Sequence, residues 1–205
     1  SVKIMRLSID IKKEIFEPGD PVFAMDYTFL GYVYNSKGKY DSALMYLNQA
    51  ISIREKQLKA DDVEMSHTLF NLSASYEGKS DLVKALSLNQ RSYNIRAKKL
   101  GTDNATISNN INSIGRIYRK LGNHERALEY YRQALEIRKA TLGADHPNVA
   151  ASYYEIGNLY GTISNYHAAL EFVQQGNRIL ESNTQVTNDV LPSDIAYAGK
   201  MYGLI

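Results

Sequence analysis

The chain has 205 residues, of which 44% are hydrophobic and 22% are charged, and its formal net charge is only +2. This composition predicts a folded protein and excludes intrinsic disorder, while the small charge gives no reason to expect nucleic acid or membrane as a partner. There is no cysteine, so disulfides, thiolate nucleophiles and cysteine-ligated metals are excluded. No stretch approaches the roughly 18 apolar residues of a membrane span, and residues 1–16 lack the apolar core of a signal peptide. We expect a cytoplasmic protein.

The sequence repeats itself at intervals of 42 residues. Tyrosine occupies one position of this repeat throughout, at Tyr34, Tyr76, Tyr118, Tyr160 and Tyr202. An alanine followed by a leucine recurs in the same phase, beginning at Ala43, Ala85, Ala127 and Ala169. Self-similarity at a fixed period of this length predicts an array of like structural units.

Each unit is predicted to contain two helices. The first carries apolar or small residues at i, i+3, i+4 and i+7, as in Tyr27, Leu30, Gly31 and Tyr34, which lie on one helix face. The second follows a short break such as residues 37–40. The first helices are predicted to begin at Pro21, Val63, Ala105 and Pro147. Asp103 and Asp145, just before two of these starts, are candidate N-caps.

The period divides the chain into a single predicted array over residues 1–205. Residues 1–20 are the second helix of a truncated unit, four full units cover residues 21–62, 63–104, 105–146 and 147–188, and residues 189–205 are the first helix of a fifth unit. The polar connector 181–194 contains Pro192, so we expect a helix to stop near Ser182 and the last to start near Leu191. Neither end has the polar face of a capping repeat, which suggests a piece of a longer array.

The spacing Tyr27-x2-Leu30-Gly31-x2-Tyr34, followed by Ala43, resembles the tetratricopeptide repeat (TPR) signature, with tyrosine in place of its tryptophan. The period exceeds the usual one of about 34 residues. In this it resembles the repeats of kinesin light chains and of bacterial arrays attached to signalling ATPase or caspase-like modules. The resemblance implies an all-α, right-handed solenoid of antiparallel helix pairs. HEAT and armadillo units, with periods of roughly 40–47 residues, are the alternative.

The added residues fall between Ala50 and Leu69, because the interval from Tyr34 to Ala43 is that of an ordinary TPR. They therefore extend the second helix, the connector or the start of the next first helix.

In such a solenoid the first helices line a concave wall. The helix stripe opposite the repeated tyrosines is the predicted binding face, and it also includes Met25, Thr28, Phe29, Asn35, His67 and Glu155. The candidate peptide-binding residues are Tyr32, Phe70, Asn71, Asn109, Asn112, Arg116, Arg119, Lys120, Tyr154 and Asn158.

These residue types suit a peptide ligand. Amides can hold a peptide backbone, since they both donate and accept hydrogen bonds, and the cations on residues 116–120 can hold carboxylates. The aromatic residues offer apolar surface. We expect a groove for an extended, acidic or carboxylate-bearing peptide with an apolar anchor; the alternative is that these side chains are merely solvated.

A second basic row recurs in phase at Lys12, Arg54, Arg96 and Arg138. We interpret it as cations in the last turns of second helices, where they complement the helix dipole. A nucleic-acid track is disfavoured because no aromatic residues accompany the row.

Catalytic signatures are missing from the sequence. The four histidines have no metal-ligand spacing, and no phosphate loop or nucleophile motif is present, so we expect no enzyme activity, cofactor or metal. Two further functions stay open beside peptide binding: a sensor segment of a larger signalling enzyme, and an assembly scaffold that self-associates.

Overall fold

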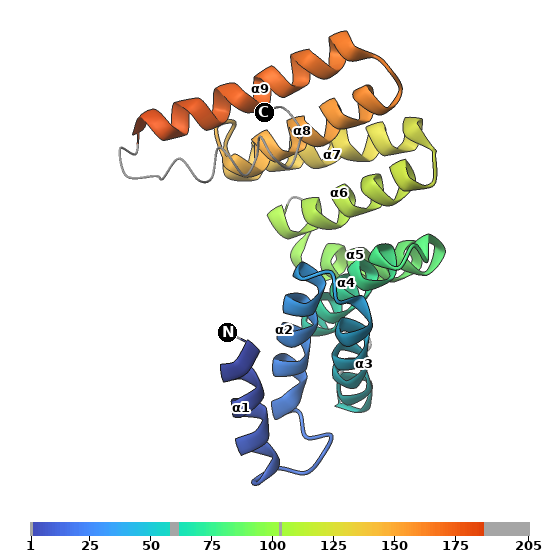
Figure 1. Ribbon diagram of the computed structural model, residues 1–205, viewed down its shortest axis with the longest axis vertical. Helices are drawn as coiled ribbons and strands as arrows, with labels where there is room; N and C mark the ends of the chain where they lie inside the picture. The colour runs from blue at the N-terminus through green and yellow to red at the C-terminus, as the bar shows by residue number, and fades with distance from the viewer. Residues whose placement is uncertain (1, 58–61, 103, 187–205) are drawn as a thin grey trace. The chain divides into compact units, whose positions relative to one another are not determined.

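The structure is a computed structural model and describes residues 2–57, 62–102 and 104–186. All regular structure within these residues is α-helical (Figure 1). The chain divides into two compact units, Ser1–Thr102 and Asp103–Ile205, and each is described by itself. The helix predicted over residues 189–205 lies outside the described residues.

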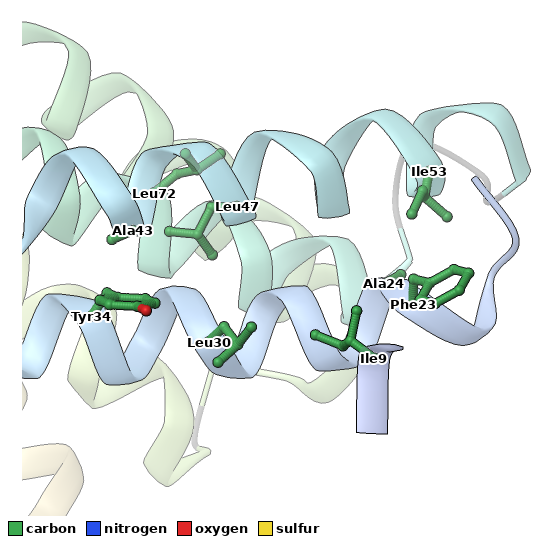
Figure 2. Close-up of a cluster of buried hydrophobic side chains, with 9 residues drawn as sticks. All are labelled: Ile9, Phe23, Ala24, Leu30, Tyr34, Ala43, Leu47, Ile53 and Leu72. Carbon is green, nitrogen blue, oxygen red and sulfur yellow. The ribbon is translucent and has the colours of Figure 1, made fainter. Parts of the chain in front are cut away.

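The first unit contains five helices. They are α1 (Val2–Lys13), α2 (Val22–Ser36), α3 (Tyr40–Gln57), α4 (Val63–Gly78) and α5 (Leu82–Leu100). The helices α2 and α3 form one packed pair and α4 and α5 another, while α3 also packs on α4 and α1 on α2. Leu30 and Tyr34 of α2 face Ala43 and Leu47 of α3 in the core (Figure 2).

The second unit contains α6 (Ala105–Lys120), α7 (His124–Leu142), α8 (Pro147–Thr162) and α9 (Tyr166–Val186). Its pairs are α6 with α7 and α8 with α9, joined by the packing of α7 on α8. Tyr131, Ile156 and Leu159 are fully buried in this core. The predicted alternation of first and second helices is therefore present in both units.

Three of the repeated tyrosines stack on an aromatic ring of the second helix of their own pair. The ring of Tyr34 stacks on that of Tyr46 with centroids 5.6 Å apart. In the second unit Tyr118 stacks on Tyr130 at 5.4 Å, and Tyr160 stacks on Phe172 at 5.5 Å. Offset stacking of this kind adds to the burial of the rings.

Glycine in the middle of the first helices lets the two helices of a pair approach closely. A Cβ atom on Gly115 would lie 2.8 Å from Cδ1 of Tyr131 and 3.2 Å from the carbonyl oxygen of Ala127. Gly157 is similarly close to Val173 and to the carbonyl oxygen of Ala169. The large second-helix side chain thus occupies the space that any first-helix side chain would need.

The turn inside every pair has the same geometry. Residues with positive φ lie in phase at Gly38 (67°), Ser80 (63°), Gly122 (77°) and Ser164 (60°). The next residue donates its N–H to the carbonyl of the repeated tyrosine, as in Lys39 to Tyr34 at 2.9 Å and Asn123 to Tyr118 at 3.0 Å. This is the left-handed C-terminal cap that satisfies the last carbonyls of a helix.

The first helices begin where predicted at Val63, Ala105 and Pro147, and α2 begins one residue late at Val22. The predicted N-cap Asp145 is wrong, because His146 caps α8 by accepting the N–H of Asn148 on its ring nitrogen. Asn104 caps α6, while Asp103 lies outside the described residues. The cap is in both cases the residue directly before the first helical one.

Two predicted helix ends need correction. The helix α1 stops at Lys13, short of residue 20, and Pro18 and Gly19 follow in the turns before α2. The helix α9 runs past the predicted end at Ser182 to Val186. Its polar end is held because Asn183 donates its side-chain amide to the carbonyl of Asp145 at 2.6 Å.

The added length of the repeat lies mainly in the second helices. These have 18 to 21 residues in α3, α5, α7 and α9. The first helices α2, α4, α6 and α8 have 15 or 16. Because the second helices are longer, the arginines near their ends, such as Arg96 and Arg138, contact first helices.

Candidate functional site

The candidate residues divide between the two units. Tyr32, Phe70 and Asn71 lie on α2 and α4 of the first unit, and the others lie on α6 and α8 of the second. All of them are on first helices, so the predicted helix assignment is correct, but their surroundings differ.

An open pocket of about 290 Å³ lies on the first unit between α2, the end of α3 and α4. Six of its lining residues belong to the predicted stripe: Met25, Thr28, Phe29, Tyr32, His67 and Asn71. The other two, Arg54 and Glu64, were not predicted to lie here. Met25, Phe29 and Tyr32 are 66%, 43% and 57% exposed, which makes this side of α2 an apolar surface open to a ligand.

Amides on this face are partly engaged in the fold. Asn35 donates to the carbonyl of Asn71 at 2.8 Å and accepts from the hydroxyl of Ser75 at 2.7 Å, so it links α2 to α4. Asn71 donates its side-chain amide to the carbonyl of His67 at 2.9 Å. Asn71 is half-buried, and in the described part of the chain its side-chain oxygen makes no hydrogen bond.

Phe70 does not offer the free ring face that the sequence suggested. The guanidinium of Arg96 lies over its ring, 5.1 Å from the centroid, and Phe70 is half-buried. Arg96 also donates Nε to the hydroxyl of Ser66 at 3.1 Å and lies 3.4 Å from Nδ1 of His67. Burial lowers the pKa of Arg96 to about 10, which still leaves it charged at neutral pH.

His67 lies between two arginines at the edge of this pocket. Desolvation, followed by the positive charges of Arg96 and Arg54, lowers the pKa of His67, with a smaller opposing effect of Glu64. The imidazole is therefore neutral at pH 7 and adds a polar group but no charge to the pocket.

The basic cluster of the second unit consists of Arg116, Arg119 and Lys120 near the end of α6. Arg116 donates to the hydroxyl of Ser113 at 3.3 Å, and Lys120 is exposed. The Nε atom of Arg119 is buried and has no hydrogen-bond partner among the described residues. Asn112, one turn before Arg116, is only 8% exposed, and its side-chain oxygen is also unpaired there.

Tyr131 of α7 connects this cluster with α8. Its hydroxyl is fully buried, and burial, followed by repulsion from Glu155, raises the pKa of Tyr131 well above its usual value. Arg119 and Arg116 act in the opposite direction. Glu155 of α8 and the two arginines of the basic cluster therefore act on the same buried hydroxyl from opposite directions.

Asn109 and Asn158 remain at the surface of their helices, exposed and half-buried respectively. The side-chain oxygen of Asn109 accepts from Arg138 at 3.0 Å, which leaves its amide hydrogens for a ligand. The prediction that Tyr154 offers apolar surface to a ligand is wrong, because Tyr154 is only 5% exposed and its hydroxyl donates to Asn177 of α9 at 2.6 Å. It belongs to the core between α8 and α9 and offers no apolar surface.

The second basic row is structural, as predicted, but for a different reason. Arg54, Arg96 and Arg138 are buried, and Arg96 and Arg138 precede the last turn of their helices. Each reaches toward neighbouring first helices: Arg138 donates to Ser108 of α6 at 3.2 Å and to Ser152 of α8 at 2.7 Å. The serines in phase at Ser66 and Ser108 were the signal in the sequence that could have revealed these contacts.

No group of three or more histidine, aspartate or glutamate side chains in the described chain could hold a metal ion. None of the helices in the described ranges is long and apolar enough to cross a bilayer.

Comparison with known proteins supports the repeat. The model of the tetratricopeptide repeat family matches residues 22–98 and 104–182. Crystal structures with a similar fold include a putative kinesin light chain from Podosopora anserina with nearly identical TPR-like repeats (22% identity, 91% of this chain and 88% of that one, TM-score 0.68). They also include BtubC (BKLC) from P. vanneervenii (19%, 93% and 74%, TM-score 0.75) and apo RapI (18%, 90% and 64%, TM-score 0.71). No curated protein sequence matches the chain.

Proposed function

The chain belongs to the tetratricopeptide repeat family, a family of protein-interaction modules with an α-solenoid fold, and we propose that it binds an extended, acidic peptide segment of a protein partner. The observation that carries this proposal is the gathering of Arg116, Arg119 and Lys120 on the first helix α6. The module acts by binding and not by catalysis.

Two features of α6 support an acidic ligand. Two arginines can present forked donors to carboxylates, which bind better to a guanidinium than to a simple charge. Asn109 lies before Arg116 on the same helix. Its side-chain oxygen accepts a hydrogen bond from Arg138, so its amide hydrogens remain available to peptide carbonyls.

We further propose that residues 1–205 form one array of the predicted units, since the period is unbroken along the sequence. The cytoplasmic location expected from the sequence stays a prediction. A sensor segment of a larger enzyme would use the same peptide-binding face. The coding sequence on either side of residues 1–205 would distinguish such a segment from a free-standing module. A self-associating scaffold predicts a molecular mass that rises with protein concentration in light scattering.

The test is a selection from an unbiased displayed-peptide library. The wild type is compared with a variant in which Arg116, Arg119 and Lys120 are replaced by glutamate. A matched control replaces Lys37, Arg91 and Arg178, which are exposed and lie in a turn or on second helices, so that the net charge changes equally. Circular dichroism must show that all three proteins fold.

Acidic peptides that the wild type and the control select and the α6 variant does not are the expected result. Peptides selected equally by all three proteins would place the binding site elsewhere and contradict the proposal. Selection of peptides without acidic residues would contradict the ligand class.

A further inference from the structure

The buried arginines of the second helices do not all have the same partners. Arg96 donates Nε to Ser66 at 3.1 Å, and Arg138 donates Nε to Ser108 at 3.2 Å. Each serine hydroxyl in turn donates to the carbonyl three residues earlier, at 2.6 Å in both cases. One repeat earlier, Arg54 is in phase with these arginines, but Ala24 stands where the serine would be.

As a result, the Nε atom of Arg54 is buried and has no hydrogen-bond partner among the described residues. The side chain is 6% exposed, and its ion pair with Glu64 joins Nη2 and Oε2 at 3.3 Å. Glu64 itself is 51% exposed, and pairs of that kind contribute little stability because water competes for both ions. The guanidinium of Arg54 is thus less firmly held than those of Arg96 and Arg138.

Arg54 also lines the open pocket that is lined by the exposed apolar side chains of Met25, Phe29 and Tyr32. A buried cation with unused donors next to exposed apolar side chains is an arrangement that a ligand can complete. Burial strengthens a hydrogen bond to a charged group, and the apolar wall adds contact area that water does not stabilise. The donors of Arg138, by contrast, are used within the fold, by Ser108, Ser152, Asn109 and the carbonyl of Asn148.

We propose that the pocket between α2, α3 and α4 binds an apolar side chain of a peptide against Phe29 and Tyr32, and that the carboxylate of the adjacent acidic residue binds the guanidinium of Arg54. This inference rests on the proposed function, since it names a second element of the same class of ligand. It assigns the apolar anchor to the first unit and gives Arg54 a binding role that its in-phase partners lack.

The carboxylate of Glu64 does not prevent this contact. A guanidinium has five N–H donors, and Glu64 uses only one of its nitrogens in the described structure. The ligand carboxylate can bind the guanidinium together with Glu64, or it can displace the Glu64 side chain into water. Displacement costs little free energy because Glu64 is already half-exposed. His67, neutral at pH 7, adds no repulsion toward either ligand group.

The test uses synthetic octapeptides with a glycine–serine frame and a central Leu-Glu pair, with Leu-Gln and Ala-Glu versions as comparison. Binding is followed by chemical-shift changes in the 15N-labelled protein. Leu-Glu is expected to shift the signals of Tyr32 and His67 and to bind about tenfold more tightly than either comparison peptide, as expected for a charge-assisted hydrogen bond or a buried leucine side chain.

Two variants locate the effect in the protein. Ala24→Ser supplies the hydroxyl that Ser66 and Ser108 supply elsewhere, so it should engage Nε of Arg54 and weaken Leu-Glu binding about three- to tenfold while the charge stays in place. The matched control is Ala150→Ser, because Ala150 is buried, is in phase with Ala24, and has Leu180 in place of the arginine. Phe29→Ala, at an exposed position, should weaken Leu-Glu but leave Ala-Glu unchanged.

The outcomes separate this inference from the proposed function. If acidic peptides need the α6 cations but bind equally to wild type, Ala24→Ser and Phe29→Ala, the pocket inference is wrong and the proposed function stands. Equal binding of Leu-Gln and Leu-Glu would show a purely apolar site and contradict the role of Arg54. No shift with any peptide would overturn the inference as well.

Discussion

Replacing Ser80 and Ser164 by glycine should stabilise the protein, because both serines occupy the left-handed turn position that holds glycine in the other two pairs. Their φ angles are 63° and 60°, against 67° for Gly38 and 77° for Gly122. Both side chains are exposed, so the change removes no packing.

The magnitude follows from two opposing effects. A residue with a Cβ atom pays about 1–2 kcal/mol in the left-handed conformation. Glycine adds about 0.4–1 kcal/mol of flexibility to the unfolded chain, which reduces the gain. Each substitution should therefore raise the free energy of unfolding by about 0.5–1 kcal/mol.

Urea denaturation followed by far-UV circular dichroism measures this free energy directly. The reverse variants Gly38→Ser and Gly122→Ser are the matched controls, and each should lose about the amount that its counterpart gains. The reasoning would be refuted if Ser80→Gly and Ser164→Gly lowered the stability, or if the reverse variants were neutral, because the turn would then not require positive φ.

Three further predictions concern packing and charge. Gly115→Ala should lower the free energy of unfolding by about 1–3 kcal/mol, because the new Cβ would contact Tyr131. Gly161→Ala should raise it by up to about 1 kcal/mol, because nothing lies within 4 Å of the new Cβ. Equal urea midpoints for the two variants would contradict the close helix contact at Gly115. Tyr131→Phe should change stability by less than about 1 kcal/mol because the buried hydroxyl lacks a hydrogen-bond partner in the described chain, and a larger loss in thermal unfolding would reveal one. The folded pKa of His67 is lowered, so the unfolded chain takes up the proton first and stability falls as the pH drops below about 6.5. His67→Gln should make this fall smaller; an unchanged pH dependence would show that other groups cause it.

The repeat phase was enough to predict helix pairs and most first-helix starts, because the same residues recur wherever the same contact is made. Tyr34, Tyr118 and Tyr160 each stack on the second helix, and the glycine before each of them lies where the helices meet. Helix ends were less predictable, since single contacts decide them. Asn183, near the end of α9, donates a hydrogen bond to the carbonyl of Asp145, 38 residues away, and no local sequence pattern predicts such a contact.

The candidate site was predicted only in outline. The predicted stripe on α2 is exposed at Met25, Phe29 and Tyr32, but the position of a residue in a stripe does not tell how deeply its side chain is buried. Tyr154 was misjudged since Gly176 on α9 leaves room for its ring, which therefore packs inward. The structural role of the arginine row was predicted, but its burial was not, because a cation near a helix end is usually solvated; for Arg96 and Arg138 the in-phase serines are the signal in the sequence.

The central claim is that the exposed faces of the first helices bind an acidic peptide. The most direct measurement is the chemical-shift map of the 15N-labelled protein with the tightest peptide from the library. The account predicts that the largest changes lie on α6 and α8, at Asn109, Arg116, Arg119 and Asn158, and that they disappear at high salt. Changes confined to the outer surfaces of α5, α7 or α9, or changes that salt does not reduce, would contradict it.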